Sequence, residues 1–261
     1  MILDEIAEYT KERVRALKAH KSLYAVRDEA EGRPQGKDFR AALAAPGLSV
    51  IAELKKASPS KGIIAPDFTD SYLRKAAEYE AGGAAAISCL TEPKFFQGSD
   101  AYLQAVRQRV ELPLLRKDFT LDEYQIYEAK CIGADAVLLI CSLLSAEQLG
   151  EYLAQVQELG LSALVEAHTA GEVQMALAAG AEIIGVNNRN LKDFTVDLGN
   201  AARLREGAPA GTVFVAESGV SSPADAAALR KTGADAVLAG EYLMRAADKK
   251  QALDALREAV K

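Results

Sequence analysis

The sequence predicts an α/β protein, a (β/α)8 TIM barrel with an N-terminal helical extension, and three observations lead to this fold class. Eight short apolar runs alternate with helical patterns along the chain. Four of these runs follow a Gly-Ala or Gly-Gly-Ala step at intervals of roughly fifty residues, about twice the length of one βα unit. The runs are continuously apolar, which is typical of parallel strands that helices cover.

The expected strands occupy eight ranges in order: 48–54, 82–90, 112–119, 133–141, 161–167, 180–187, 212–218 and 233–240. Helical patterns separate them, for example over 71–83, 145–160 and 222–233. A doubly wound open sheet would show the same alternation. The near-even spacing, and the absence of a G-x-G-x-x-G turn after the first strand, favour the closed barrel. We expect a single domain over 1–261, with the barrel over 46–261.

Residues 1–45 precede the first strand and form the predicted extension. Leu3, Ile6, Val14 and Leu17 recur at a spacing that one face of a helix would bury. Such a helix either covers the barrel or lines its mouth, and the sequence favours neither.

Composition excludes several classes of protein. The chain has 261 residues, of which 49% are hydrophobic, and a net charge of −6, so it can bury a substantial core and is not expected to bind nucleic acid. The longest apolar run is too short to span a membrane, and the N-terminus lacks the pattern of a secretory signal. Three cysteines without a CxxC pair indicate free thiols in a reducing compartment, so we expect a cytoplasmic protein.

The two histidines, His20 and His168, are too few and too far apart for a zinc cluster, and we expect no metal and no cofactor. His168 follows a strand and has two interpretations: it enters a site, or it lies in a solvated loop. The second is the prediction.

Charged residues stand where the first strand ends. Glu53 and Lys55 are two and four residues beyond Ile51, so all three point to the same face. Burying such ions costs several kcal/mol each, which predicts that this strand opens into a site that uses the charges.

Other expected strands also end in polar residues, and in a barrel these ends meet at one rim. The residues are Lys117, Glu166, Asn187, Arg189, Glu217 and Ser218. Carboxylates and lysines brought together there would shift one another's pKa values, as acid–base catalysis requires.

The last two strands end in glycine-containing loops, at Ser218-Gly219 and at Gly240. Ser222 is a predicted N-cap with Pro223 at the first helical position. Backbone N–H groups in these two loops form a phosphate site in many barrels, although simple helix capping would need the same residues.

Several motifs together resemble the indole-3-glycerol phosphate synthase family: IAELKKASPSKG, LTEPKFFQGS, LLRKDF, LVEAH, GVNNRNL, AESG and AGEYLMR. They occur in order over nearly the whole chain. The chain stops after the eighth helix, so we expect a monofunctional enzyme. The resemblance implies a carboxy-lyase of tryptophan biosynthesis that closes the pyrrole ring of 1-(2-carboxyphenylamino)-1-deoxyribulose 5-phosphate, releasing carbon dioxide and water.

The resemblance also implies roles for individual residues. Lys117 is the general acid and Glu166 the general base; Glu53 stabilises a cationic intermediate and Lys55 holds substrate anions. Asn187 orients an acid group or a hydroxyl, and Ser218 is the sixth catalytic residue. The implied substrate-binding residues are Ser58, Phe96, Phe119, Leu138, Arg189, Leu191, Glu217, Gly219 and Gly240. For the apolar members of this set, ordinary core packing is the alternative.

Two other functions stay open. One is a different phosphate-sugar lyase or aldolase that uses Lys117 as a Schiff base. The other is a barrel that binds a sugar phosphate as a sensor or scaffold, which the rim carboxylates disfavour because they repel anions. The expected partner is a small sugar phosphate derived from anthranilate, and the expected state is a monomer.

Overall fold

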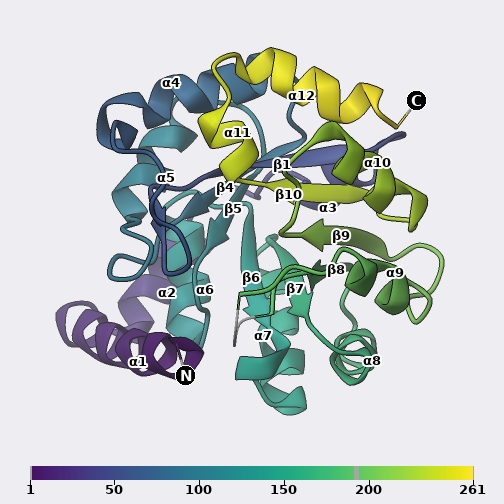
Figure 1. The fold of residues 1–261 in the computed structure, drawn as a ribbon. Coiled ribbons are helices and arrows are strands. Elements are labelled where there is room, and N and C mark those ends of the chain that lie inside the picture. Colours follow the sequence, from purple (N-terminus) through teal and green to yellow (C-terminus); the bar gives the residue numbers. More distant parts are fainter. Residues whose placement is uncertain (1, 191–193, 261) are drawn as a thin grey trace.

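The computed structural model describes residues 2–190 and 194–260, and a closed barrel of eight parallel strands lies at its centre (Figure 1). The strands are β1 (Ser49–Leu54), β4 (Ala86–Leu90), β5 (Leu114–Lys117), β6 (Ala136–Ile140), β7 (Ser162–Ala167), β8 (Ile183–Asn187), β9 (Val213–Glu217) and β10 (Ala236–Ala239). β1 pairs with β4 on one side and with β10 on the other, which closes the sheet. All eight predicted strands are confirmed, and the open-sheet alternative is wrong.

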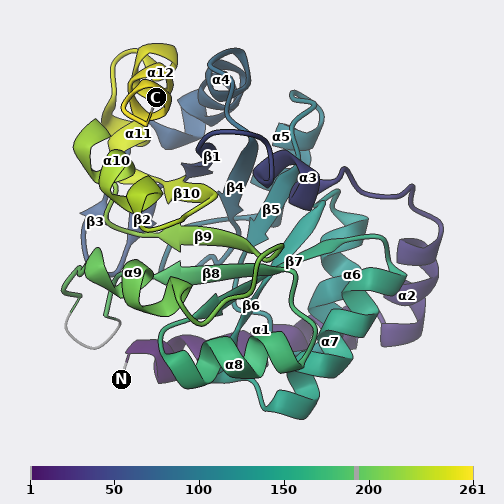
Figure 2. The ribbon, with the colours of Figure 1, turned by 90° about the vertical axis from the view of Figure 1, so that its right-hand side faces the viewer.

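Helices surround this barrel (Figure 2). They are α4 (Phe68–Ala81), α5 (Asp100–Arg107), α6 (Glu123–Cys131), α7 (Ala146–Glu158), α8 (Ala170–Ala178), α9 (Gly199–Arg205), α10 (Pro223–Lys231), α11 (Glu241–Arg245) and α12 (Lys249–Glu258). A 3-10 turn, η1 (Cys141–Leu143), follows β6. Gly133, Gly180 and Gly233, which lie between a helix and the next strand, have left-handed φ angles of 90–91°, as the repeat predicted.

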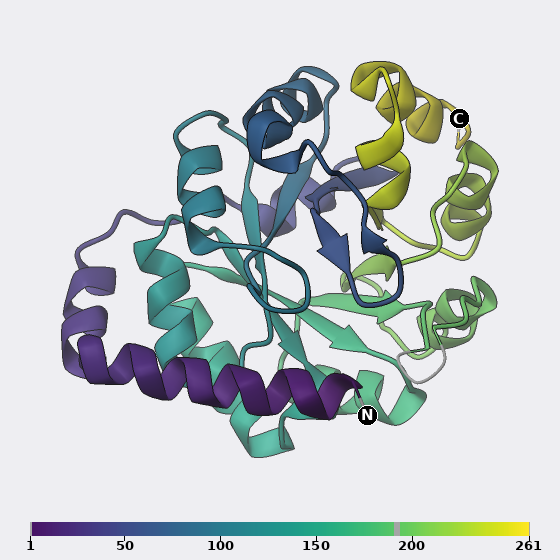
Figure 3. The same ribbon diagram turned by 60° about the vertical axis from the view of Figure 1, so that its left-hand side comes forward.

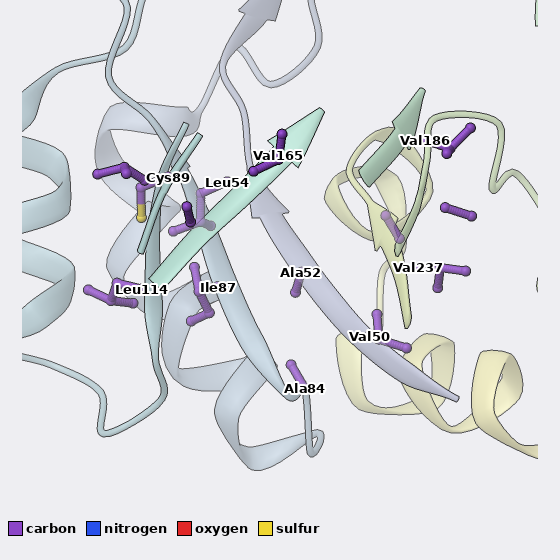
Figure 4. Packing of buried hydrophobic residues seen from close by; sticks show 14 of the residues in the cluster. Val50, Ala52, Leu54, Ala84, Ile87, Cys89, Leu114, Val165, Val186 and Val237 are labelled. Carbon is purple, nitrogen blue, oxygen red and sulfur yellow. The ribbon is translucent and has the colours of Figure 1, made fainter. Parts of the chain in front are cut away.

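Side chains alternate between two cores along each strand. Val50, Ala52 and Leu54 of β1 point outward and pack with residues such as Ile87 and Leu114 (Figure 4). Ile51 points inward and packs with Leu115, Leu138, Leu164 and Val215 inside the barrel. The inward set is apolar in the lower layers, and it becomes charged where the strands end.

The N-terminal extension contains three helices, α1 (Ile2–His20), α2 (Leu23–Glu31) and α3 (Phe39–Leu43). Phe39 and Leu43 of α3 are fully buried and pack with Ala136 and Ala236, the first residues of β6 and β10, so α3 closes the amino-terminal end of the barrel. Figure 3 shows α1 crossing the opposite end of the barrel, on the side of a hairpin formed by residues 57–63.

That hairpin was not predicted. β2 (Ala57–Ser58) and β3 (Gly62–Ile63) are antiparallel and lie in the loop after β1. Each has two residues, which is too short to produce a recognisable alternation of apolar and polar side chains.

Within the two described ranges, none of the helices has the length and apolar character that crossing a membrane requires. The three cysteines are free thiols, as predicted.

Candidate active site

A cavity of about 790 Å³ opens at the carboxyl ends of the strands. Twelve of the predicted site residues line it: Glu53, Lys55, Ser58, Phe96, Lys117, Phe119, Asn187, Arg189, Glu217, Ser218, Gly219 and Gly240. They come from positions spread over nearly two hundred residues of sequence, and the barrel brings them together because all parallel strands end on the same side.

Glu53 and Lys55 lie on the inner face of β1 and in the loop after it. Glu53 is 3% exposed, and its carboxylate accepts a hydrogen bond from the Lys55 ammonium. Gly240 leaves the space that this pair needs, because a Cβ atom there would lie 2.4 Å from Glu53 Oε2 and 2.9 Å from Lys55 Nζ. The charges at the end of β1 therefore enter the cavity as a compensated pair.

Lys117, the last residue of β5, lies between two buried carboxylates. Its Nζ is 3.1 Å from Glu217 Oε2 and 3.3 Å from Glu166 Oε2. Burial alone would lower the pKa of Lys117, but the carboxylates of Glu217, Glu166 and Glu53 outweigh it and raise that pKa above its ordinary value. Lys117 is therefore held as an ammonium.

Glu217 ends β9 and is 2% exposed. Burial raises its pKa to about 7; Lys117 opposes the rise, and the neighbouring Glu166 adds to it. Gly185 on β8 makes room for this side chain, since a Cβ atom there would lie 2.1 Å from Glu217 Oε1. Glu217 thus changes its charge near neutral pH.

Glu166 lies behind the cavity surface rather than among the residues that line it. Its Oε2 faces Lys117, and its Oε1 accepts a hydrogen bond from Asn187 Nδ2 at 3.2 Å. Burial would raise the pKa of Glu166, but Lys117 and then His168 lower it below its ordinary value. Glu166 is therefore an ionised carboxylate whose oxygens face different neighbours.

The prediction that His168 lies in a solvated loop is wrong. Its side chain is 19% exposed, and its Nε2 is 3.4 Å from Glu166 Oε1. The imidazole packs behind Glu166 because α8 begins immediately after it, with Thr169 as the N-cap. A single histidine after a strand carries no signal that separates this position from a loop, so sequence reasoning missed it.

An aromatic pair forms one wall of the cavity. The rings of Phe96 and Phe119 are 6.0 Å apart, centre to centre. The loop that carries Phe96 is held by Glu92, a fully buried residue whose carboxylate accepts hydrogen bonds from the backbone N–H groups of Lys94, Phe95 and Phe96. This wall suits a flat aromatic ring.

The other two apolar predictions have different outcomes. Leu138 is 3% exposed and packs in the barrel interior, outside the set that lines the cavity. Leu191 lies outside the described residues. For Leu138 the structure favours the alternative interpretation, ordinary core packing.

Arg189 lines the cavity at the end of β8. Its Nη1 donates to the carbonyl oxygen of Phe194 at 2.9 Å, and its backbone N–H donates to Asn187 Oδ1 at 3.0 Å. Asn187 therefore connects the Arg189 loop to the Glu166 carboxylate.

The loop after β9 turns sharply at Ser218 and Gly219, whose φ angles are 63° and 94°. Ser218 has no glycine-like freedom, so its left-handed backbone is strained. In the part of the chain that the structure describes, the backbone N–H groups of Gly219 and Val220 make no hydrogen bond to protein. Ser222 caps α10 with Pro223 at its first position, as predicted.

The extension also reaches the cavity, which resolves the alternatives for residues 1–45. Ile2, Leu3 and Ile6 of α1 line it. Arg13 of α1 donates a hydrogen bond to Asp118 at 2.8 Å, and Asp118, with a side chain 1% exposed, directly follows Lys117. The extension therefore covers the barrel and lines its mouth at once.

Two cations at the cavity were not predicted. Lys61 lines it from the hairpin loop, and Arg245 lines it from α11, where its Nε is 3.0 Å from Glu241 Oε1. No group of three or more His, Cys, Asp or Glu residues able to hold a metal ion occurs in 2–190 or 194–260.

Solved structures with the same fold are similar at low sequence identity. A 3-hexulose-6-phosphate synthase matches with a TM-score of 0.64 and 19% identity, over 82% of this chain and 100% of its own. An orotidine 5'-phosphate decarboxylase from Pyrococcus horikoshii matches with a TM-score of 0.63 and 12% identity, over 81% of this chain and 98% of its own. At these identities they show the barrel fold alone.

The family model for indole-3-glycerol phosphate synthase matches residues 3–256. Proteins of that name are similar over full length: one from Ruminiclostridium cellulolyticum is 53% identical over 98% of this chain and 99% of its own. One from Endomicrobium trichonymphae is 50% identical over 99% and 100%, respectively. The chain therefore belongs to the indole-3-glycerol phosphate synthase family, the carboxy-lyases of tryptophan biosynthesis that its motifs indicated.

Proposed function

We propose that the cavity binds 1-(2-carboxyphenylamino)-1-deoxyribulose 5-phosphate and closes its pyrrole ring, with Lys117 as the general acid. The observation that carries this proposal is the position of Lys117 between two buried carboxylates at the cavity. Those carboxylates keep a proton on Nζ, so the residue has one to donate when the ring carbon attacks the ketone and an alkoxide develops.

Glu166 serves as the base. Its ionised carboxylate accepts the proton that leaves the carbon beside the nitrogen, and Asn187 holds it in place. Glu53 adds negative charge that stabilises the cation left by loss of carbon dioxide. Lys55, paired with Glu53, attracts the substrate anions and serves as a second acid.

The substrate has an aromatic end and a phosphate end, and each would bind where the cavity offers groups of matching chemistry. The anthranilate ring lies against Phe96 and Phe119, and its carboxylate faces Arg189. The phosphate binds to Ser58, Ser218 and the backbone N–H groups near Gly219 and Gly240. The cavity volume of about 790 Å³ lies within the range of small-molecule sites.

A Schiff-base mechanism is disfavoured by the same geometry. An imine needs a neutral amine, and the carboxylates around Lys117 raise its pKa, which stabilises the charged form. Borohydride added with substrate is expected to trap no lysine adduct.

We also propose that the protein acts as a monomer in the cytoplasm. The monomer is supported by the cavity, because one chain supplies every residue assigned a role.

The direct test supplies the anilino-deoxyribulose phosphate and follows indole fluorescence. Lys117→Met is expected to lower kcat by about 10²–10⁴-fold, because the acid is lost, with an unchanged far-UV CD spectrum. Lys231→Met, which removes an exposed lysine at the end of α10, is the matched control. Near-normal kcat in the Lys117 variant would remove this residue from its role.

A further inference from the structure

His168 connects the buried acid–base cluster to the protein surface. Its Nε2 is 3.4 Å from Glu166 Oε1, and its Nδ1 is 3.6 Å from Glu172 Oε2. The Nε2 atom is buried and makes no hydrogen bond within the described chain. The imidazole thus lies between a carboxylate that is 4% exposed and one that is 21% exposed.

The start of α8 fixes this arrangement. Thr169 caps the helix and accepts a hydrogen bond from the Glu172 N–H, while Glu172 Oε2 accepts one from the His168 backbone N–H at 2.6 Å. These contacts hold Glu172 beside the imidazole, on the side away from Glu166.

The two oxygens of Glu166 face different partners. Oε1 is the oxygen nearest His168, and Oε2 is the oxygen nearest Lys117, at 3.3 Å from Nζ. A proton that arrives at Oε1 therefore comes to face Lys117 when the carboxyl group makes half a turn about its Cγ–Cδ bond, with no movement of the rest of the side chain.

The ring closure consumes one proton in each turnover. The former ketone oxygen takes up two protons and leaves as water, while one proton is released from the carbon beside the nitrogen. The electron pair of the broken bond to the carboxylate restores the aromatic ring, and carbon dioxide leaves uncharged. Recycling the released proton therefore leaves the acid one proton short.

We propose that His168 supplies this missing proton to Lys117 through Glu166, an inference that rests on the role proposed for Lys117. The imidazolium gives its Nε2 proton to Oε1 of the ionised Glu166. The Glu166 carboxyl group, after half a turn about its Cγ–Cδ bond, gives that same proton to the neutral Lys117 amine. His168 is left neutral with its remaining proton on Nδ1, and Lys117 is again an ammonium. The imidazole regains its second proton from water when the ring turns and brings Nε2 out of its buried position. His168 therefore acts on Lys117 only through Glu166.

The surrounding charges support this role. Burial would lower the pKa of His168, but Glu172 on α8, Glu166 on β7 and Glu217 on β9 outweigh it and raise that pKa. The ring therefore carries its proton closer to neutral pH than a free histidine does.

The test separates the first turnover from later ones in His168→Gln. Gln keeps an N–H group near the position of Nε2 but cannot carry a proton. Lys117 begins protonated, so the first turnover does not need His168. A rapid-mixing experiment that follows indole fluorescence should show a first-turnover rate within about twofold of wild type. The steady-state rate that follows should be lower than that of wild type by about tenfold or more. His20→Gln, which changes the exposed histidine at the end of α1, is the matched control.

His168→Ala gives a second readout. Because the imidazole edge is exposed, added imidazole should enter the vacated space and restore the steady-state rate. Equal slowing of the first and later turnovers in the Gln variant would mean that His168 only holds Glu166 in place, and it would overturn the proposal. Unchanged rates in both phases would overturn it too, because Lys117 would then take its proton through the cavity mouth. A wild-type protein that forms no product at all would instead refute the proposed function.

Discussion

Glu166 and Glu217 both contact the ammonium of Lys117, but their surroundings shift their pKa values in opposite directions. Lys117 and His168 lower the pKa of Glu166, whereas burial raises that of Glu217 to about 7. Similar carboxylates on β7 and β9, which β8 separates, therefore differ in charge at neutral pH, which is how one site can contain both a base and a group that braces the acid.

This difference predicts the ranking of two variants. Glu166→Gln removes an ionised base and should lower kcat by about 10²–10⁴-fold at pH 7. Glu217→Gln should lower it by only about tenfold, because burial raises the pKa of Glu217 and favours its neutral form, which Gln resembles. The measurement is kcat for both variants under saturating substrate, and the reverse ranking would contradict the assignment.

The raised pKa of Glu217 also predicts a dependence of stability on pH. The folded protein retains the Glu217 proton up to pH about 7, whereas an unperturbed carboxyl of the unfolded chain loses it near 4.5. Between these two pH values the folded state binds more protons than the unfolded state. The contribution of Glu217 to the free energy of unfolding is therefore fully present below pH 4.5. It is lost as the pH rises to 7, by up to about 3 kcal/mol. The free energy of unfolding of wild type, minus that of Glu217→Gln, should therefore fall between pH 5 and pH 8; parallel profiles in urea titrations would contradict this.

At the scale of elements, α1 covers the site, and two ion pairs attach it to the barrel: Arg13 with Asp118, next to Lys117, and Lys18 with Asp122. Asp118 accepts hydrogen bonds from Arg13 and from Thr91, which follows β4, both at 2.8 Å. Its carboxylate therefore joins α1 to the ends of two strands, next to Lys117.

Arg13→Met should loosen this cover. We expect Ile2, Leu3 and Ile6 to lose their positions at the cavity, at a cost of about 1 kcal/mol in substrate binding, or roughly fivefold in KM, with a smaller change in kcat. Arg15→Met removes the same charge from an exposed position on α1 and serves as the control. Equal KM values for the two variants would show that α1 contributes nothing to binding.

Elements also show what the sequence could and could not predict. The strands were predictable because glycine steps and continuous apolar runs act locally, and Lys117 and Glu217 were predictable because strand ends must meet. The contact of His168 with Glu166 was not predictable, since it depends on where α8 begins relative to β7. The position of Glu166 behind the cavity surface, which Asn187 lines, was not predictable either. It depends on packing between strands rather than on any local pattern.

For the whole molecule, the extension is packed at both ends of the barrel. Phe39 and Leu43 close the amino-terminal end, while Arg13 attaches α1 at the mouth. The single domain predicted for 1–261 stays a prediction, and this packing gives it a physical basis.

The expected result is one cooperative unfolding transition. Unfolding curves from far-UV CD, which reports the helices and strands, should coincide with those from tyrosine fluorescence, to which Tyr9 and Tyr24 of the extension contribute. An early fluorescence change that precedes loss of the CD signal would show that the extension unfolds separately.

Ser218 retains a left-handed backbone that glycine would adopt at no steric penalty, and a non-glycine residue there gives up about 1–3 kcal/mol. A laboratory screen for heat resistance alone should therefore enrich glycine at this position. A screen for bacterial growth without added tryptophan should retain the serine, because its hydroxyl belongs to the proposed phosphate site. The two screens should therefore select different residues at position 218. Comparing the glycine and serine variants would show how much thermal stability the protein loses at this position in exchange for catalytic activity.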